Sequence, residues 1–84
     1  NLGLRGDIAV ERGAYAEAVK FYDKAVAAAE NDLTCPMYLR KAGLAERALG
    51  NRKQAAEYFQ RILDRYPASF DAREAEQLLG SVNE

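Results

Sequence analysis

Two arginines and a leucine lie where one face of a helix could bind a carboxylate. Arg40, Leu44 and Arg47 are spaced i, i+4 and i+7, so in a helix they share one face. A guanidinium group pairs well with a carboxylate, and a leucine between two arginines adds an apolar contact. The spacing predicts a binding strip for an acidic or carboxylate-bearing segment of a protein partner. The alternative is a solvated helix face without a ligand.

Side chains that carry out catalysis are scarce. The sequence has no histidine, so the usual general base and the commonest metal ligand are missing. The single cysteine, Cys35, is either a small apolar filler or a reactive thiol at a helix start, and nothing beside it would activate it. Gly3 and Gly6 fall inside a helical pattern rather than in a phosphate loop. Glu74 and Glu76 point to different helix faces. We therefore expect no enzyme, no cofactor and no metal site.

The composition is that of a small globular protein. The 84 residues are 49% hydrophobic and 30% charged, with a net charge of −1. This charge gives no electrostatic basis for nucleic-acid binding. The longest apolar run, from Ala25 to Ala29, is far shorter than the roughly 18 residues of a membrane helix. We expect a protein or peptide partner, no nucleic acid and no membrane contact by this segment.

The elements that position these residues repeat along the chain. Residues 37 positions apart match in type: Leu2 and Leu39, Gly6 and Gly43, Gly13 and Gly50, Ala18 and Ala55, and the aromatic pairs Phe21-Tyr22 and Tyr58-Phe59. A fixed period in the 20–50 residue range indicates stacked supersecondary units. Such units commonly present extended binding surfaces to partners.

Helix-breaking residues, capping residues and the spacing of apolar residues predict five helices. They run from the N-terminus to Arg12, and over Tyr15–Glu30, Pro36–Leu49, Lys53–Tyr66 and Phe70–Ser81. Gly13 and Gly50 suit the turns after helices. Thr34 or Cys35 is the expected cap before Pro36, and Ser69 caps the last helix. The sequence therefore predicts an all-α fold of two antiparallel helical hairpins and a capping helix.

The apolar residues at helical spacing are the expected core. They are Ala18, Tyr22, Ala25, Val26 and Ala29; Leu39, Ala42, Ala45 and Leu49; Ala55, Phe59, Ile62, Leu63 and Tyr66; and Ala75, Leu78, Leu79 and Val82. We expect one domain over residues 1–84, with repeats at about 1–34 and 35–68 and a capping helix at about 70–81.

With this pattern in place, the chain resembles the tetratricopeptide repeat. The motif runs from a large apolar residue through small, turn and aromatic positions to a closing proline. In the first repeat the matching residues are Leu2, Gly6, Gly13, Tyr15, Ala18, Tyr22 and Ala25. In the second they are Leu39, Gly43, Gly50, Ala55, Phe59, Ile62 and Pro67. The resemblance implies an α-α superhelix in which glycines lie where paired helices cross closely. It places the aromatic rings toward the next repeat.

The chain departs from the motif at several positions. Arg5 and Ala42 replace leucine, Glu30 replaces proline, and Glu46 and Arg52 replace aromatic residues. The period of 37 also exceeds the usual 34 or so.

In this family one face of the first helix of each repeat lines a concave surface. Carried over to this chain, the face holds Gly3, Asp7, Val10 and Glu11, then Met37, Arg40, Leu44, Arg47 and Ala48. Some members bind a terminal carboxylate with Lys, Asn and Arg, but here Gly3, Asp7, Asp71 and Ala75 stand at those places. The resemblance therefore implies a non-catalytic protein-interaction scaffold without that clamp.

Self-association is the alternative function. Two repeats fall short of the roughly three usually needed for stability, and the first helix would expose Leu2, Leu4 and Ile8, which favours a homo-oligomer. Residues 31–43 and 66–69 are also similar to bacterial envelope proteins of this family, which carry an N-terminal membrane anchor. Because Asn1 is not an initiator methionine, we expect a piece of a longer chain. The compartment is then the bacterial envelope or, alternatively, the cytoplasm.

Overall fold

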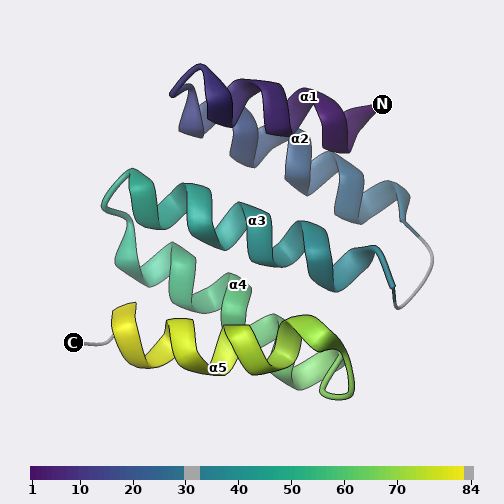
Figure 1. The fold of residues 1–84 in the computed structure, drawn as a ribbon, viewed down its shortest axis with the longest axis vertical. Helices are drawn as coiled ribbons and strands as arrows, with labels where there is room; N and C mark the ends of the chain where they lie inside the picture. The colour runs from purple at the N-terminus through teal and green to yellow at the C-terminus, as the bar shows by residue number, and fades with distance from the viewer. Residues whose placement is uncertain (30–32, 83–84) are drawn as a thin grey trace.

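The computed structural model describes residues 1–29 and 33–82, and within them it contains helices and no strand. The helices are α1 (Leu2–Glu11), α2 (Tyr15–Ala28), α3 (Cys35–Ala48), α4 (Arg52–Arg65) and α5 (Phe70–Val82). Consecutive helices run antiparallel, with α1, α3 and α5 in one layer and α2 and α4 behind them (Figure 1). The expected all-α repeat fold is confirmed.

The helix ends follow the local chemistry of the sequence. Gly13 and Gly50 have φ angles of 74° and 82°, the left-handed region in which glycine is favoured after a helix. Ser69 caps α5 as expected, because its Oγ accepts a hydrogen bond from the Ala72 N–H at 3.2 Å. Asn1 caps α1 in the same way, which was not foreseen: its Oδ1 accepts from the Leu4 N–H at 2.7 Å.

The end of α2 differs from the expectation. The helix was expected to continue to Glu30 but ends at Ala28, and Ala29 is the cap, with an extended backbone (φ −79°, ψ 133°). Glu30 lies outside the described residues, as do Asn31 and Asp32.

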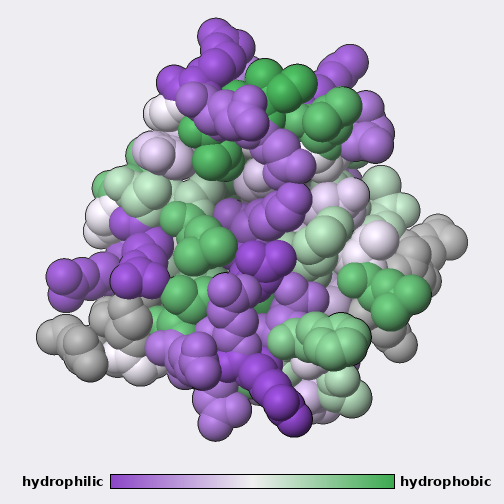
Figure 2. Space-filling view, in the orientation of Figure 1, coloured by the Kyte–Doolittle hydropathy of each residue, from purple (hydrophilic) through white to green (hydrophobic). Residues whose placement is uncertain are grey.

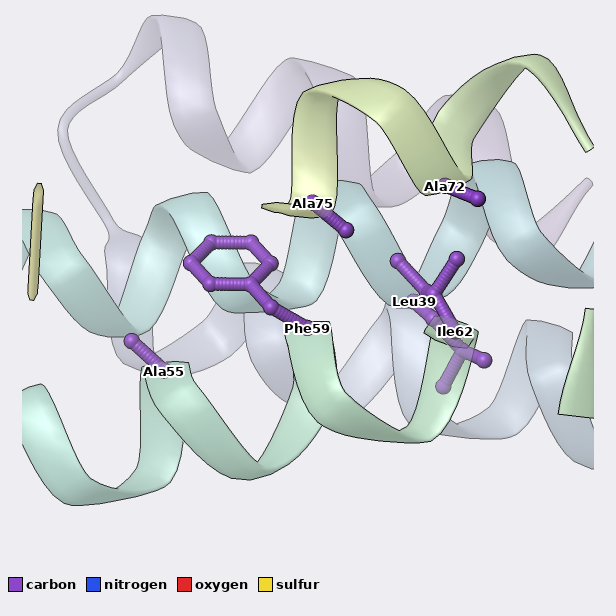
Figure 3. Close-up of a cluster of buried hydrophobic side chains, with 6 residues drawn as sticks. All are labelled: Leu39, Ala55, Phe59, Ile62, Ala72 and Ala75. Atoms are coloured by element: carbon purple, nitrogen blue, oxygen red, sulfur yellow. The ribbon is translucent and has the colours of Figure 1, made fainter. Parts of the chain in front are cut away.

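Two clusters of buried side chains meet at α3. The first lies between α3, α4 and α5 and contains Leu39, Ala55, Phe59, Ile62, Ala72 and Ala75 (Figure 3). The second lies between α1, α2 and α3 and contains Ala9, Ala18, Tyr22, Ala42 and Ala45. Because α3 contributes to both clusters, it fixes the position of the helices on either side of it.

Glycines let the paired helices approach, as the resemblance implied. A Cβ added at Gly6 would overlap the Tyr22 ring, and one at Gly43 would overlap the Phe59 ring. These rings were expected to face the next repeat. Each does so, because it packs in a cluster with alanines of the following helix, and each also covers the glycine of its own repeat.

A few core assignments need correction. Leu49 was expected to be buried but is 42% exposed, because it is the cap residue of α3, where the chain turns toward α4. The side chain of Val82 lies outside the described part of the structure. Cys35 is buried and its Sγ lies 3.7 Å from the Val26 carbonyl oxygen, which favours the apolar-filler interpretation.

Candidate functional site

A hollow of about 320 Å³ opens between α1 and α3, with α2 beneath it. Its lining is mostly apolar, and the residues that form it are Asp7, Val10, Tyr15, Tyr22, Arg40, Lys41, Leu44 and Ala45. It belongs to the face formed by α1, α3 and α5. Figure 2 shows that hydrophilic side chains form a band across this face, with hydrophobic side chains on both sides.

One polar wall of the hollow is a hydrogen-bonded network between α1, α2 and α3. The Tyr22 hydroxyl donates to Asp7 Oδ1 at 2.6 Å, and Lys41 Nζ donates to the two carboxylate oxygens at 2.9 and 3.1 Å. Burial raises the pKa of Asp7, but the hydrogen bonds from Tyr22 and Lys41 and the charge of Lys41 outweigh it, so the pKa lies below its usual value. Burial and the Asp7 carboxylate raise the pKa of the Tyr22 hydroxyl.

This network makes stability depend on pH. Because the folded-state pKa of Asp7 is depressed, its contribution is present above the unfolded-state pKa of about 3.9 and is lost as the pH falls through the folded-state pKa. We expect Asp7→Asn to lower the free energy of unfolding at pH 7 by about 0.5–1.5 kcal/mol, the ordinary value of one hydrogen bond. The effect is no larger because the Asp7 side chain is 42% exposed, so solvent screens its ion pair with Lys41. The difference from wild type should shrink toward about pH 3.

Urea unfolding at several pH values measures this difference. The matched control is Glu11→Gln on the same helix, because Glu11 is exposed and makes no hydrogen bond or ion pair among the described residues. If the free energies of unfolding of Asp7→Asn and wild type differ by the same amount down to about pH 3, the Asp7 carboxylate is not the source of the pH dependence.

The other polar wall is Arg40, which is bound to the capping helix. Its Nε lies 2.7 Å from Asp71 Oδ1 and 3.1 Å from Glu74 Oε2. The side chains of Arg40 and Asp71 are only 23% and 15% exposed. The spacing of Arg40, Leu44 and Arg47 predicted that Arg40 belongs to a strip open to a partner. In the structure its Nε already has carboxylate partners on α5.

The hollow brings together four of the seven residues proposed from the sequence. Asp7, Val10, Arg40 and Leu44 line it, whereas Glu11, Met37 and Arg47 do not. Glu11 and Arg47 are exposed, and Met37 is half-buried. Gly3, also expected on this face, is buried, and the Tyr38 ring covers the position of its missing Cβ.

Sequence reasoning missed the other half of the lining, namely Tyr15, Tyr22, Lys41 and Ala45. Tyr22 was assigned to the core by its spacing and is indeed 2% exposed, although its ring also closes the hollow from below. Lys41 carries no sequence signal of its own, because its partner Asp7 lies 34 residues earlier in the chain.

A second polar group links α2, α3 and α4 outside the hollow. Tyr58 donates a hydrogen bond to Asp23, and the Arg61 guanidinium lies 5.4 Å from the centre of the Tyr58 ring. Glu46, one of the departures from the repeat motif, is buried and accepts a hydrogen bond from Asn51 Nδ2 at 3.1 Å. The turn from α3 to α4 thus satisfies a carboxylate at a position where an aromatic side chain is usual.

Comparison with known families agrees with this geometry. Two family models, both described as tetratricopeptide repeat, match residues 1–32 and residues 38–69. Together the two ranges span 64 of the 84 residues. The chain belongs to the tetratricopeptide repeat family. No curated protein and no solved structure matches it.

Membership gives this chain a general role. Tetratricopeptide repeats generally mediate protein–protein interactions, and proteins built from them are generally non-catalytic scaffolds. The family matches say nothing about the bacterial envelope, so that expectation stays a prediction. In the part of the repeat protein that the structure describes, no helix combines the length and apolar character needed to cross the bilayer. Within residues 1–29 and 33–82, no cluster of three or more metal-ligating side chains occurs.

Proposed function

We propose that this tetratricopeptide repeat protein is a non-catalytic scaffold whose α1–α3 face binds a protein or peptide partner. The contact residues that we propose are Asp7, Val10, Glu11, Met37, Arg40, Leu44 and Arg47. The hollow carries the proposal, because four of these seven residues line it. A concave and mostly apolar site with a few converging polar groups is the usual form of a binding site.

Leu44 is the central apolar contact in this proposal. It is half-buried, so part of its side chain stays free to contact a ligand, and it lies on the same helix as Arg40 and Lys41. Burying an aliphatic or aromatic side chain against such a surface contributes about 1.5–3 kcal/mol. A few contacts of this kind supply most of the binding energy in typical interfaces.

The test is selection of short random peptides displayed on phage against the immobilised protein. We expect peptides to be enriched, and Leu44→Gln to weaken binding of the enriched peptides by about tenfold or more. Leu49→Gln is the matched control, because Leu49 belongs to the same chain segment, is exposed and does not line the hollow. Far-UV circular dichroism verifies that both variants fold.

Two outcomes contradict the proposal. One is that no peptide is enriched by the wild-type protein. The other is that Leu44→Gln and Leu49→Gln bind the enriched peptides equally well, since binding then lies outside the hollow.

Self-association through α1 is the second candidate, and the exposure of α1 favours it. Leu4 and Ile8 are 56% and 45% exposed and lie one turn apart on the helix. Contiguous apolar surface of this kind favours association. Light scattering should then give a mass that rises with concentration for the wild type and a monomer mass for a Leu4→Gln/Ile8→Gln variant. A concentration-independent monomer in both rules out this candidate.

A further inference from the structure

We infer that Asp71 and Glu74, on the capping helix, determine which partner side chain the hollow accepts, and that it accepts a bulky uncharged apolar one rather than a carboxylate. The inference rests on the proposed function, since it assumes that the hollow binds a partner. Neither residue lines the hollow. They act through Arg40, which does.

The cations of the hollow are both engaged within the chain. Lys41 pairs with Asp7, and Arg40 pairs with Asp71 and Glu74. The two cations thus face three carboxylates, which leaves a net charge of −1 over these five paired groups. Of the two arginines in the strip that the sequence predicts, Arg40 is therefore neutralised from α5, whereas Arg47 is exposed and does not line the hollow.

Packing holds the Asp71 carboxylate in place beside Arg40. Asp71 lies in the first turn of α5, next to Ala72, which is buried against α4 with Ala75. Since Ala72 and Ala75 fix the rotation of α5, Asp71 faces α3 and is itself only 15% exposed. Glu74, one turn later on the same face, adds a second carboxylate.

A partner carboxylate in the hollow meets an unfavourable environment. It faces an excess of negative charge, and a close ion pair with Lys41 or with the Nε of Arg40 requires the displacement of Asp7 or of Asp71. Either exchange leaves a partly buried carboxylate without its partner, which is costly. An uncharged side chain disturbs neither pair and covers Val10 and Leu44 from water.

The size of the hollow agrees with a single bulky side chain. Its volume of about 320 Å³ lies at the lower end of ligand sites, which span roughly 300–1,000 Å³. Tyr15 and Tyr22 offer ring surfaces on which an aromatic guest can pack. Leucine, phenylalanine and tryptophan are the guests that this lining fits best.

The experiment uses two phage-displayed peptide libraries, random except for a central position fixed as Leu, Phe or Trp in one and as Asp or Glu in the other. Wild-type protein should enrich the apolar-centred library. Synthetic peptides from that selection should change in affinity less than about threefold between ~50 and ~500 mM NaCl, because no exposed ion pair forms on binding.

The decisive variant is Asp71→Asn/Glu74→Gln, which changes the local charge from −1 to +1 and frees Arg40. It should enrich acid-centred peptides about tenfold or more over wild type, with affinity that falls in high salt. Glu76→Gln is the control: it removes one exposed carboxylate of the same helix that pairs with no cation among the described residues, and it should select like wild type. Circular dichroism verifies that α5 stays folded in both variants.

The outcomes separate this inference from the proposed function. Enrichment of acid-centred peptides by wild type, with strong salt dependence, overturns the inference. A folded Asp71→Asn/Glu74→Gln variant that keeps the wild-type preference also overturns the inference. In that case, loss of binding in Leu44→Gln would still support the proposed function. If wild type enriches neither library, the proposed function itself fails.

Discussion

Phe59→Ala should lower the free energy of unfolding by about 3–5 kcal/mol, the usual cost of removing a buried phenylalanine side chain. The Phe59 ring is fully buried and contacts Gly43 on α3, and it belongs to the same cluster as Ala72 and Ala75 on α5 (Figure 3). A chain of 84 residues has a total stability of about 4–13 kcal/mol. The loss is therefore a large fraction of the whole.

Urea unfolding monitored by circular dichroism measures this loss, and the chain contains its own control. Phe70 begins α5 and is 96% exposed, so Phe70→Ala removes the same side chain where it is not buried. We expect its effect to stay within about 0.5 kcal/mol. Equal losses for the two variants would show that the ring of Phe59 does not hold α3, α4 and α5 together.

The second large effect concerns two glycines with opposite outcomes. Gly43→Ala should destabilise the protein by about 1–3 kcal/mol, because the added methyl overlaps the fully buried Phe59 ring, which must then shift within the packed core. Gly80→Ala should stabilise it by a few tenths to about 1 kcal/mol, because alanine is the better helix former and nothing lies within 4 Å of the added methyl.

The pair of variants isolates the steric term, because both replace a helical glycine by alanine. Thermal unfolding should move the midpoint down for Gly43→Ala and up for Gly80→Ala. Adding Phe59→Leu to Gly43→Ala should relieve part of the clash. The double variant should therefore lose less stability than the sum of the losses of the two single variants. Shifts of the same sign for Gly43→Ala and Gly80→Ala would rule out the close approach of Gly43 to Phe59.

The charge environment of α3 links the proposed binding to the way the helices stack. Two adjacent residues of α3 reach in opposite directions, Lys41 to Asp7 on α1 and Arg40 to Asp71 on α5. These pairs connect α1 and α5 to α3 on the face that we propose for binding, while the buried clusters connect each helix to the layer behind. Substitutions in these ion pairs therefore change the charge of the hollow without removing a buried apolar side chain.

The sequence alone determined the elements of this protein and their order. The turn glycines, Pro36 and Ser69 mark helix ends through local backbone preferences, and the spacing of small and aromatic residues follows from the close approach of paired helices. The resemblance to the tetratricopeptide repeat also implied that Asp7, Val10, Arg40 and Leu44 share a face, because in this family one face of the first helix of each repeat lines a concave surface. All of these features depend on residues near one another in the chain, or on a period that can be read along it.

The chemistry of that face depends on how the helices pack against one another. Arg40 and Arg47 look equivalent in sequence, yet Arg40 is held by Asp71 and Glu74 while Arg47 is exposed without an ion pair among the described residues. Lys41 meets Asp7 across a gap of 34 positions, and Tyr22 serves both the core and the hollow. The physical reason is that charge pairing and cavity shape depend on distances between helices. Those distances are set by how Tyr22 and Phe59 pack against glycines and alanines, and no local pattern specifies them.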